Sequence, residues 1–511
     1  MKRPLVFFLF FIFVFASSFV RANDSSTVKA IDTSAAQTDS ASAPQADDTS
    51  ADQANDASAA KLEAVASIDR QASDMIRLSD QIWAFAETAL RETRSAALLA
   101  DYAEAQGFEV ERGVAKMPTA FVASFGKGRP IIGIMGEYDA LLGISQKAQT
   151  AKEALEEGAA GHGCGHNLFG PASLTAAIAI KELIAEGDLE GTIRFYGTPA
   201  EEDIGGKVYM LRAGLFDDVD VALAWHPDFS NEAETAGSQA MASLAVEFRG
   251  RTAHAAFDPW NAHSALDGVE LFTHGINLMR EHVRPSVRMH YVIADGGDVP
   301  NVVPDYAKVL LWVRDSKHTG ADELVKKARA VAEGAALATG TEASFTIQGG
   351  SYEMLVNLEG AKLIHNNMDW LGPVEFTEQE QKFARAIQRE TGVEPTGLRS
   401  NLEPLDLTRR EPEGGSTDVA DVSWVVPTLS LLTTAAAYDA PWHAWPVVAT
   451  SGMSIGHKGM VYAAKALAAT MVDLYQNPEQ RAAIVKEFEE QTKGIEFKFY
   501  IPEGPPPVPN D

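Results

Sequence analysis

The chain has 511 residues, 46% of them hydrophobic, which is enough for two globular domains with packed cores. It has 71 Asp and Glu against 43 Lys and Arg, and its formal net charge of −28 argues against nucleic acid or an anionic membrane as a partner. The single cysteine, Cys164, excludes an internal disulfide. That thiol is inert in a core, reactive, or bound to a metal.

The first 60 residues predict a targeting segment and a tether. The start MKRP, the apolar run from Leu5 to Phe15 and the small residue Ala22 predict a secretory signal peptide over residues 1–22. A retained anchor is the alternative, but the run is shorter than the roughly 20 residues that a membrane-spanning helix needs. Residues 23–60 are rich in Ser, Ala, Asp, Gln and Thr, and they predict a disordered acidic linker. We therefore expect an exported protein, periplasmic or secreted, that is free of the membrane after cleavage.

Residues 61–237 show the pattern of an α/β domain. Apolar residues recur at helical spacing from Lys61 to about Gln106, where Gly107 is a plausible stop. Strands are then predicted around 130–142, 191–203 and 219–227, with a helix over 172–185. Strands and helices that alternate in this way predict a mostly parallel sheet covered on both faces.

The pattern changes near Ser238. Residues 238–354 read as strand, helix (262–281), two strands, helix (320–338) and strand, which predicts an inserted α+β domain of the ferredoxin-like open-sandwich type. The α/β domain resumes over 355–495 with a buried strand and a helix over 457–475, and a proline-rich tail follows at 496–511. The predicted fold is therefore a mostly parallel α/β catalytic domain split by an α+β dimerisation or lid domain.

Polar side chains gather where the predicted strands end. These residues are Glu137, Asp139, Glu201, Glu202, Asp203 and His226, together with Cys164 and His166 in the loop that opens a helix. Ligands bind at the carboxyl ends of strands in open α/β sheets, so we expect these side chains to share one site.

The residue types at this edge suit a metal. Thiolate, imidazole and carboxylate bind zinc, while manganese or cobalt suits sites richer in nitrogen and oxygen. Adjacent carboxylates can divide their roles, one binding the metal and the other acting as general base. The alternative makes Cys164 a catalytic nucleophile with a nearby histidine. A thiol protease, however, needs neither the Glu201–Glu202 pair nor the distant His226.

Eight motifs in order carry a resemblance to a known family. They are EYDAL, GCGHNL, PAEED, WHP, RGRTAHAA, PNVVP, STDVADVSW and PWHAW, and they span about residues 67–475. In this order the chain resembles the dinuclear-metal amidohydrolases of the aminoacylase and carboxypeptidase type. The signal peptide and the acidic linker lie outside the resemblance.

The resemblance implies two divalent metal ions, zinc or manganese with cobalt possible, and a set of ligands for them. It gives Cys164 the bridging position, His166 and His226 to one metal, and Glu202 and His443 to the other. A thiolate bridging two metals would be deprotonated and shielded from disulfide exchange.

The resemblance also assigns catalytic roles. Glu201 would be the general base, and Asp139 would orient a metal ligand. His254 would reach across a dimer interface and stabilise the oxyanion. Asn301 and Arg314 are candidates for substrate contact, although Arg314 is equally a plausible strand-end charge.

The expected activity is metal-dependent hydrolysis of the amide in a small N-acyl amino acid. The first expectation is p-aminobenzoyl-glutamate, cleaved to p-aminobenzoate and glutamate in folate catabolism. A dipeptidase or N-acyl-amino-acid deacylase with the same mechanism is the alternative. A non-catalytic partner subunit is a third reading, which the retained set of ligands and base argues against. We expect a homodimer or a hetero-oligomer with a related subunit.

Overall fold

The structure is a computed structural model that describes residues 58–409, 411–412 and 414–509. The predicted signal peptide and residues 23–57 of the predicted linker lie outside the described residues. The described residues all belong to one compact unit. Because this unit is not divided further, the domain boundaries predicted within it stay predictions.

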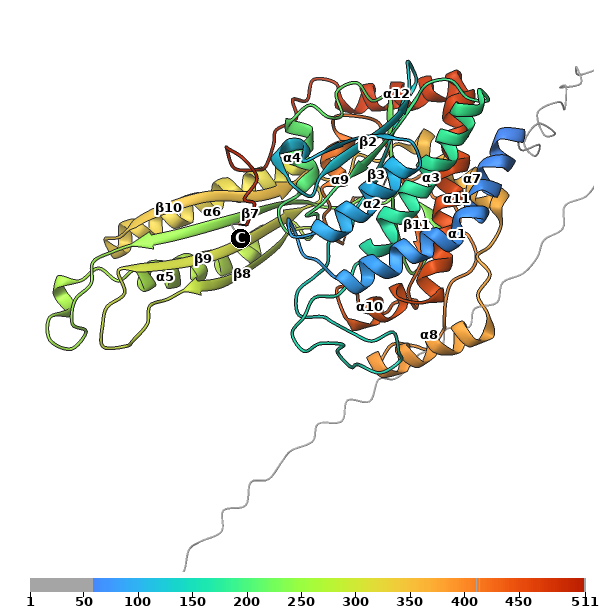
Figure 1. The fold of residues 1–511 in the computed structure, drawn as a ribbon. Coiled ribbons are helices and arrows are strands. Elements are labelled where there is room, and N and C mark those ends of the chain that lie inside the picture. Colours follow the sequence, from blue (N-terminus) through green and yellow to red (C-terminus); the bar gives the residue numbers. More distant parts are fainter. Residues whose placement is uncertain (1–57, 410, 413, 510–511) are drawn as a thin grey trace, which may run out of the picture. The chain divides into compact units, whose positions relative to one another are not determined.

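A seven-stranded mixed sheet forms the larger part of the fold (Figure 1). Its strands are, in spatial order, β1 (Glu109–Arg112), β2 (Phe121–Gly126), β4 (Thr192–Gly197), β3 (Ile131–Gly136), β5 (Val221–Asp228), β11 (Thr428–Thr434) and β6 (Glu232–Ala233). The central strands β4, β3, β5 and β11 are parallel, and the edge strands pair antiparallel. The parallel centre follows from the sequence, since β3 is an apolar run that is buried along its whole length.

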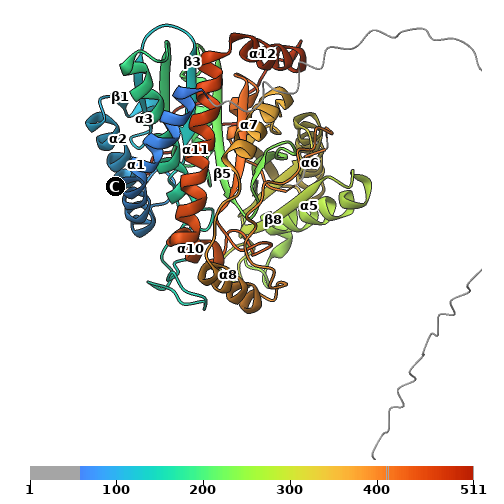
Figure 2. The same ribbon diagram turned by 90° about the vertical axis from the view of Figure 1, so that its right-hand side faces the viewer.

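Long helices cover this sheet. Figure 2 shows α1 (Ala59–Phe85), α3 (His166–Glu186) and α11 (Ser454–Gln476) side by side, and these three helices contact one another. Helix α3 alone among the described helices is long and apolar enough to cross a membrane, but 78% of its most apolar window is buried within the fold. Its composition therefore fits a core helix.

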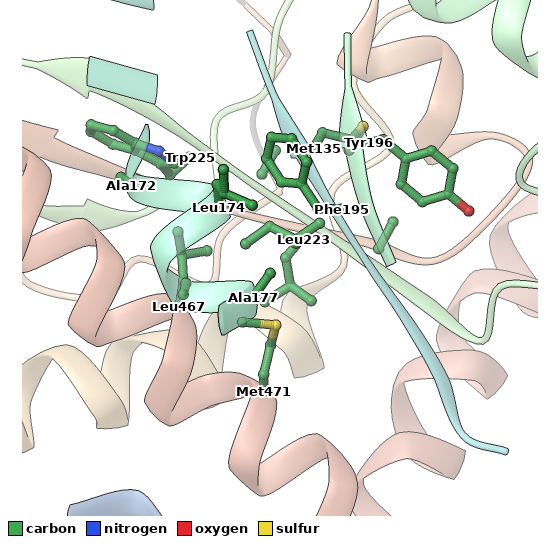
Figure 3. Packing of buried hydrophobic residues seen from close by; sticks show 14 of the residues in the cluster. Met135, Ala172, Leu174, Ala177, Phe195, Tyr196, Leu223, Trp225, Leu467 and Met471 are labelled. Carbon is green, nitrogen blue, oxygen red and sulfur yellow. The ribbon is translucent and has the colours of Figure 1, made fainter. Parts of the chain in front are cut away.

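The core lies between these helices and the sheet. Figure 3 shows Leu174 and Ala177 of α3 near Leu467 and Met471 of α11, with Leu223 of β5 beside them. All five side chains are completely buried. Burial of a leucine side chain contributes about 2 kcal/mol, so this layer holds the strands whose ends carry the polar side chains.

A second sheet has four antiparallel strands. In chain order the segment runs β7 (Ala240–Arg249), α5 (Ala265–Met279), β8 (Arg288–Asp295), β9 (Tyr306–Asp315), α6 (His318–Thr339) and β10 (Glu342–Ser351). The spatial order β10-β7-β9-β8 leaves β8 at an edge. Both helices contact β7 and β9, and their apolar faces form one core with the sheet. The predicted α/β fold with an inserted α+β sandwich is confirmed.

The larger part also contains α2 (Thr93–Ala105), α4 (Gly206–Arg212), α7 (Leu358–Leu371), α8 (Glu378–Thr391), α9 (Val419–Ser423), α10 (Trp445–Ser451), α12 (Pro478–Thr492) and the 3-10 helix η1 (Val114–Lys116). Two further 3-10 helices, η2 (Pro259–Asn261) and η3 (Arg280–His282), lie between β7 and β8.

Three local features were not predicted. The helical pattern expected over 61–106 is two helices, because Ala86 takes a left-handed conformation (φ 44°) and Thr88 then bridges to Ala140. The antiparallel strands β1 and β2 were not predicted, since β1 is short and mostly exposed. Helix α12 was also missed, although Asn477 caps it with a side chain that accepts from Gln480 N.

Candidate active site

Side chains that follow three neighbouring strands meet at the carboxyl edge of the seven-stranded sheet. Glu137 and Asp139 follow β3, Glu201 and Glu202 follow β4, and His226 lies near the end of β5. These strands are adjacent and parallel, so their ends lie side by side. The expected gathering of these residues is present, and their individual roles remain predictions.

The glycine-rich loop before α3 brings Cys164 and His166 to this edge. Gly165 takes a left-handed conformation (φ 79°), and a Cβ there would come within 3.1 Å of Pro227. Glycine therefore allows the close approach to β5 that places Cys164 Sγ 3.3 Å from His226 Nε2. His166 begins α3 and is completely buried.

Asp139 holds two groups of the site in place. Its Oδ1 lies 2.9 Å from His166 Nδ1, and its Oδ2 accepts a 2.9 Å hydrogen bond from the backbone N–H of Glu202. The contact at Nδ1 leaves His166 Nε2, which is buried and without a hydrogen-bond partner, to face the cluster. This geometry is that of a carboxylate that orients a histidine ligand.

Two groups of potential ligands share Cys164. One is Cys164, His166 and His226, and the other is Cys164, Glu202 and His443; within each group the ligand atoms all lie within 4.8 Å of one another. Glu202 Oε1 is buried without a hydrogen-bond partner, and Glu202 Oε2 lies 3.5 Å from His443 Nε2. Sulfur, nitrogen and oxygen donors at these spacings fit two divalent ions that share the thiolate.

Burial is the first cause of the shifted pKa values of these groups. It raises the pKa of the Cys164 thiol, with the Glu202 carboxylate as a further cause. Burial also raises the pKa of Glu202 to about 7 and lowers that of His226 to about 4, in the latter case helped by His166. Burial and the neighbouring carboxylates Glu137 and Glu202 raise the pKa of Glu201 well above its ordinary value. A bound cation reverses this balance, because it favours the thiolate and the carboxylates.

The turns that carry the ligands include a left-handed backbone. Ala200, directly before the two glutamates, has φ 62°, and His443 has φ 51°. The N–H of Ala200 donates a 2.9 Å hydrogen bond to Oε1 of Glu92, a buried carboxyl whose pKa is raised to about 8 by burial and by Asp139. Glu92 therefore fixes the turn from which Glu201 projects, a role that the sequence did not suggest.

A buried ion-pair cluster beside the ligands was also missed. The Lys207 ammonium lies 2.6 Å from Glu137 Oε1 and 2.6 Å from Asp418 Oδ1, and all three side chains are at most 3% exposed. Asp418 belongs to the motif STDVADVSW, and that motif was the feature of the sequence that could have pointed to Asp418. Lysine in a polar segment is normally exposed, so nothing local marked Lys207.

The predicted substrate contacts lie in the four-stranded part. His254 and Asn301 are exposed, and the contacts of His254 stay within neighbouring loops, including a β-bridge to Val302. A cavity of about 580 Å³ opens beside these loops, and none of the potential metal ligands lines it.

Arg314 differs, because it lies within electrostatic range of the cluster. Its Nη1 donates a 2.9 Å hydrogen bond to Ser416 Oγ, and its charge acts on both Glu201 and His443. Burial lowers the pKa of Arg314. The structure thus brings Arg314 to the metal-ligand cluster, whereas none of the described contacts of His254 reaches it.

Comparison with known sequences gives consistent matches. A profile of peptidase family M20/M25/M40 matches residues 133–389. The chain is 38% identical over 461 residues to one of the two subunits of the p-aminobenzoyl-glutamate hydrolase of Escherichia coli K12, covering 84% of this chain and 95% of the relative. The other subunit of that hydrolase is 28% identical over 45% of this chain and 55% of its own length. The human Xaa-Arg dipeptidase is 29% identical, with 86% of this chain and 94% of the relative covered.

Comparison with solved structures supports the fold. An aminohydrolase structure from methicillin-resistant Staphylococcus aureus superposes with a TM-score of 0.62 at 18% identity, covering 81% of this chain and 100% of that one. A dinuclear metal binding peptidase of the M20 family from Bacillus subtilis superposes with a TM-score of 0.54 at 16% identity, covering 80% and 98%.

Proposed function

Because the chain belongs to peptidase family M20/M25/M40, as its resemblance predicted, we propose that it hydrolyses the amide bond of a small N-acyl amino acid with two bound divalent ions. The observation that carries the proposal is the pair of ligand groups that share Cys164, with Glu201 beside them. A non-catalytic partner subunit would not need to keep both.

The proposed substrate is p-aminobenzoyl-glutamate, cleaved to p-aminobenzoate and glutamate, a reaction of folate catabolism. The 38% identical relative belongs to a hydrolase named for that substrate. Arg314 supports the choice, since a guanidinium beside the cluster can pair with a carboxylate of glutamate. The 29% identical dipeptidase supports the second candidate, a dipeptidase with the same mechanism.

The proposed ions are zinc or manganese, with cobalt as a working substitute. The sulfur donor of Cys164 and the ring nitrogens of His166, His226 and His443 favour zinc, whereas Glu202 is equally suited to manganese. Bound there, the two ions would polarise the substrate carbonyl and lower the pKa of a water molecule.

The side chains of the chain divide the rest of the work. Glu201 takes the proton from the attacking water and passes it to the leaving amine. Its raised pKa makes it a better proton acceptor than an ordinary carboxylate, and the ions would offset part of that rise. Asp139 holds His166 and the Glu202 backbone in place throughout. Asn301 and Arg314 orient the substrate.

His254 supplies the oxyanion contact from a second subunit in this proposal. It is exposed on the four-stranded part, where a partner subunit can receive it. The partner is a second copy of this chain or a related subunit, as the two-subunit relative suggests. The proposed location is outside the cytoplasm, and it rests on the predicted signal peptide alone.

The test uses the purified mature chain, loaded separately with Zn²⁺, Mn²⁺ and Co²⁺. Release of glutamate from p-aminobenzoyl-glutamate is measured beside N-acetyl amino acids and simple dipeptides. Metal-dependent release of glutamate supports both mechanism and substrate. Turnover of a different amide keeps the mechanism and discards the substrate, and a chain that binds none of the metals contradicts the proposal.

A further inference from the structure

A buried lysine ties together two carboxylates beside the proposed metal site. Lys207 lies in the first turn of α4 and is completely buried. Its ammonium lies 2.6 Å from Glu137 Oε1 and 2.6 Å from Asp418 Oδ1. Its backbone N–H also donates to Asp418 Oδ2 at 2.8 Å. One cation thus joins the end of β3 to the start of α9.

Glu137 is the unusual member of this cluster. It is 1% exposed, and neither of its carboxylate oxygens makes a hydrogen bond. Its Oε2 lies 3.0 Å from His166 Nε2, the nitrogen that faces the proposed metal, but without hydrogen-bond geometry. Lys207 is therefore the permanent cation beside Glu137, in addition to the ring of His166.

Glu137 lies outside the two ligand groups that share Cys164. Two ligands of one ion are at most about 4.5 Å apart, the sum of a metal–sulfur and a metal–oxygen bond. Glu137 groups with His166 and Glu201, and among the described residues no group of mutually close ligand atoms joins it to Cys164 or His226. Glu137 thus adjoins the two groups that share Cys164 through His166, without being part of either.

We propose that Lys207 is a positioning residue that holds Glu137 away from the metal carried by His166 and so keeps one coordination position open for water and substrate. The proposal rests on the proposed function, because it needs the metal site. A catalytic ion keeps such an open position, whereas a structural ion is fully enclosed by protein ligands. Charge compensation by the buried ammonium removes the drive for Glu137 to become a further ligand.

Removal of the ammonium should convert Glu137 into a ligand. A buried carboxylate that loses its cation is strongly destabilised, and the nearest remaining positive charge is then the ion beside His166. Since Glu137 Oε2 already lies 3.0 Å from the ligating nitrogen, a small rotation of its side chain would reach that ion. Lys207→Met should therefore enclose the metal, without any loss of metal.

The experiment loads the full mature chain with Co²⁺, whose visible absorption weakens as its coordination number rises. Lys207→Met should keep the metal stoichiometry of the parent, lose visible absorption and lose about 10- to 100-fold in kcat with little change in KM. The double variant Lys207→Met with Glu137→Gln should recover the absorption of the parent, because the intruding carboxylate is gone. A Lys207→Met spectrum equal to that of the parent overturns the proposal.

Two further variants keep the test decisive if Lys207→Met does not fold. Glu137→Gln leaves Lys207 paired with Asp418 and should keep the spectrum of the parent; a changed spectrum would make Glu137 a ligand and contradict the proposal. Lys61→Met is the control for the loss of a cation as such, because it removes a different ion pair, in which Lys61 Nζ lies 2.8 Å from Asp473 Oδ1. If the parent itself binds no Co²⁺, the proposed function fails, and the two failures are thereby distinguished.

Discussion

The two sheets of this chain differ in how deeply their side chains are buried. In the seven-stranded sheet, β3 is buried along its whole length, and the polar groups Asp139 and His166 at its edge are at most 1% exposed. In the four-stranded sheet, the edge strand β8 is largely exposed, with Val292 60% and Ile293 48% exposed. The polar side chain predicted to act from that part, His254, is exposed as well.

The buried sheet edge holds side chains whose positions must be fixed, whereas the exposed part holds side chains that a second subunit could bring to the site. Metal ligands and a general base work in a water-poor setting whose charges are already arranged, so they belong in a buried edge. A residue that contacts substrate from a second subunit needs an open surface. The apolar side chains of β8 beside unpaired strand edges also suit such an association.

The largest effect should come from the buried region. Glu201→Gln should lower kcat by about 10⁴-fold, because it removes the base, and should leave the metal content unchanged, because it removes no ligand. Steady-state kinetics and metal analysis of the same preparation check both parts. Glu190→Gln, at an exposed glutamate, is the control. Turnover close to that of the parent would remove Glu201 from the mechanism.

A smaller effect should come from the open region. His254→Ala should lower kcat by about 100-fold, as loss of an oxyanion donor does. Mixing His254→Ala chains with Glu201→Gln chains should give more activity than either variant alone, since one mixed dimer then holds an intact site. His274→Ala, at another exposed histidine of this part, is the control. Mixed dimers without activity, once subunit exchange is shown, would end the cross-subunit role.

The third effect concerns stability rather than turnover and compares one ion pair from each region. Glu380 is 5% exposed, and burial by itself would raise the pKa of its carboxyl. The Lys458 ammonium at 2.7 Å and the hydrogen bonds of the Thr377 cap outweigh burial and lower that pKa to about 2. Because the folded pKa lies below the unfolded value of about 4.3, the stabilisation is complete above that value and disappears as the pH falls toward about 2. Glu380→Gln should therefore cost up to about 3 kcal/mol near neutral pH and much less in acid.

Urea denaturation at several pH values measures this, with Glu247→Gln as the matched variant. Glu247 and Lys308 pair at 3.4 Å in the four-stranded sheet, and each side chain is 28% exposed. A pair so accessible to water contributes about 0–1 kcal/mol. Equal losses for the two variants would contradict the contrast between the regions.

The fold and the ligand cluster could be predicted from the sequence for related reasons. Apolar runs such as that of β3 and alternating strands such as β7 are local signals, and these signals predicted both sheets. The gathering of Cys164, Glu202 and His226 followed from one rule, that parallel strands present their carboxyl ends at one edge.

The supporting residues could not be predicted, because their meaning lies in distant partners. Lys207 is recognisable as special only when Glu137, 70 positions before it, and Asp418, 211 positions after it, are seen to surround it. Glu92 likewise needs the peptide N–H of Ala200, 108 positions away. Periodicity and spacing report on neighbours in the chain, and these contacts are made by neighbours in space.

The left-handed turn at Ala200 has a consequence for how this protein can drift under mutation. For alanine this conformation costs about 1 kcal/mol, which glycine would avoid, but glycine loses about 0.5–1 kcal/mol through its greater freedom in the unfolded chain. The two terms nearly cancel, so Ala200→Gly would pass unnoticed in a screen for heat stability. The same change would loosen the turn that aims Glu201. Selection on folding alone therefore cannot maintain this position, and only selection on activity protects it.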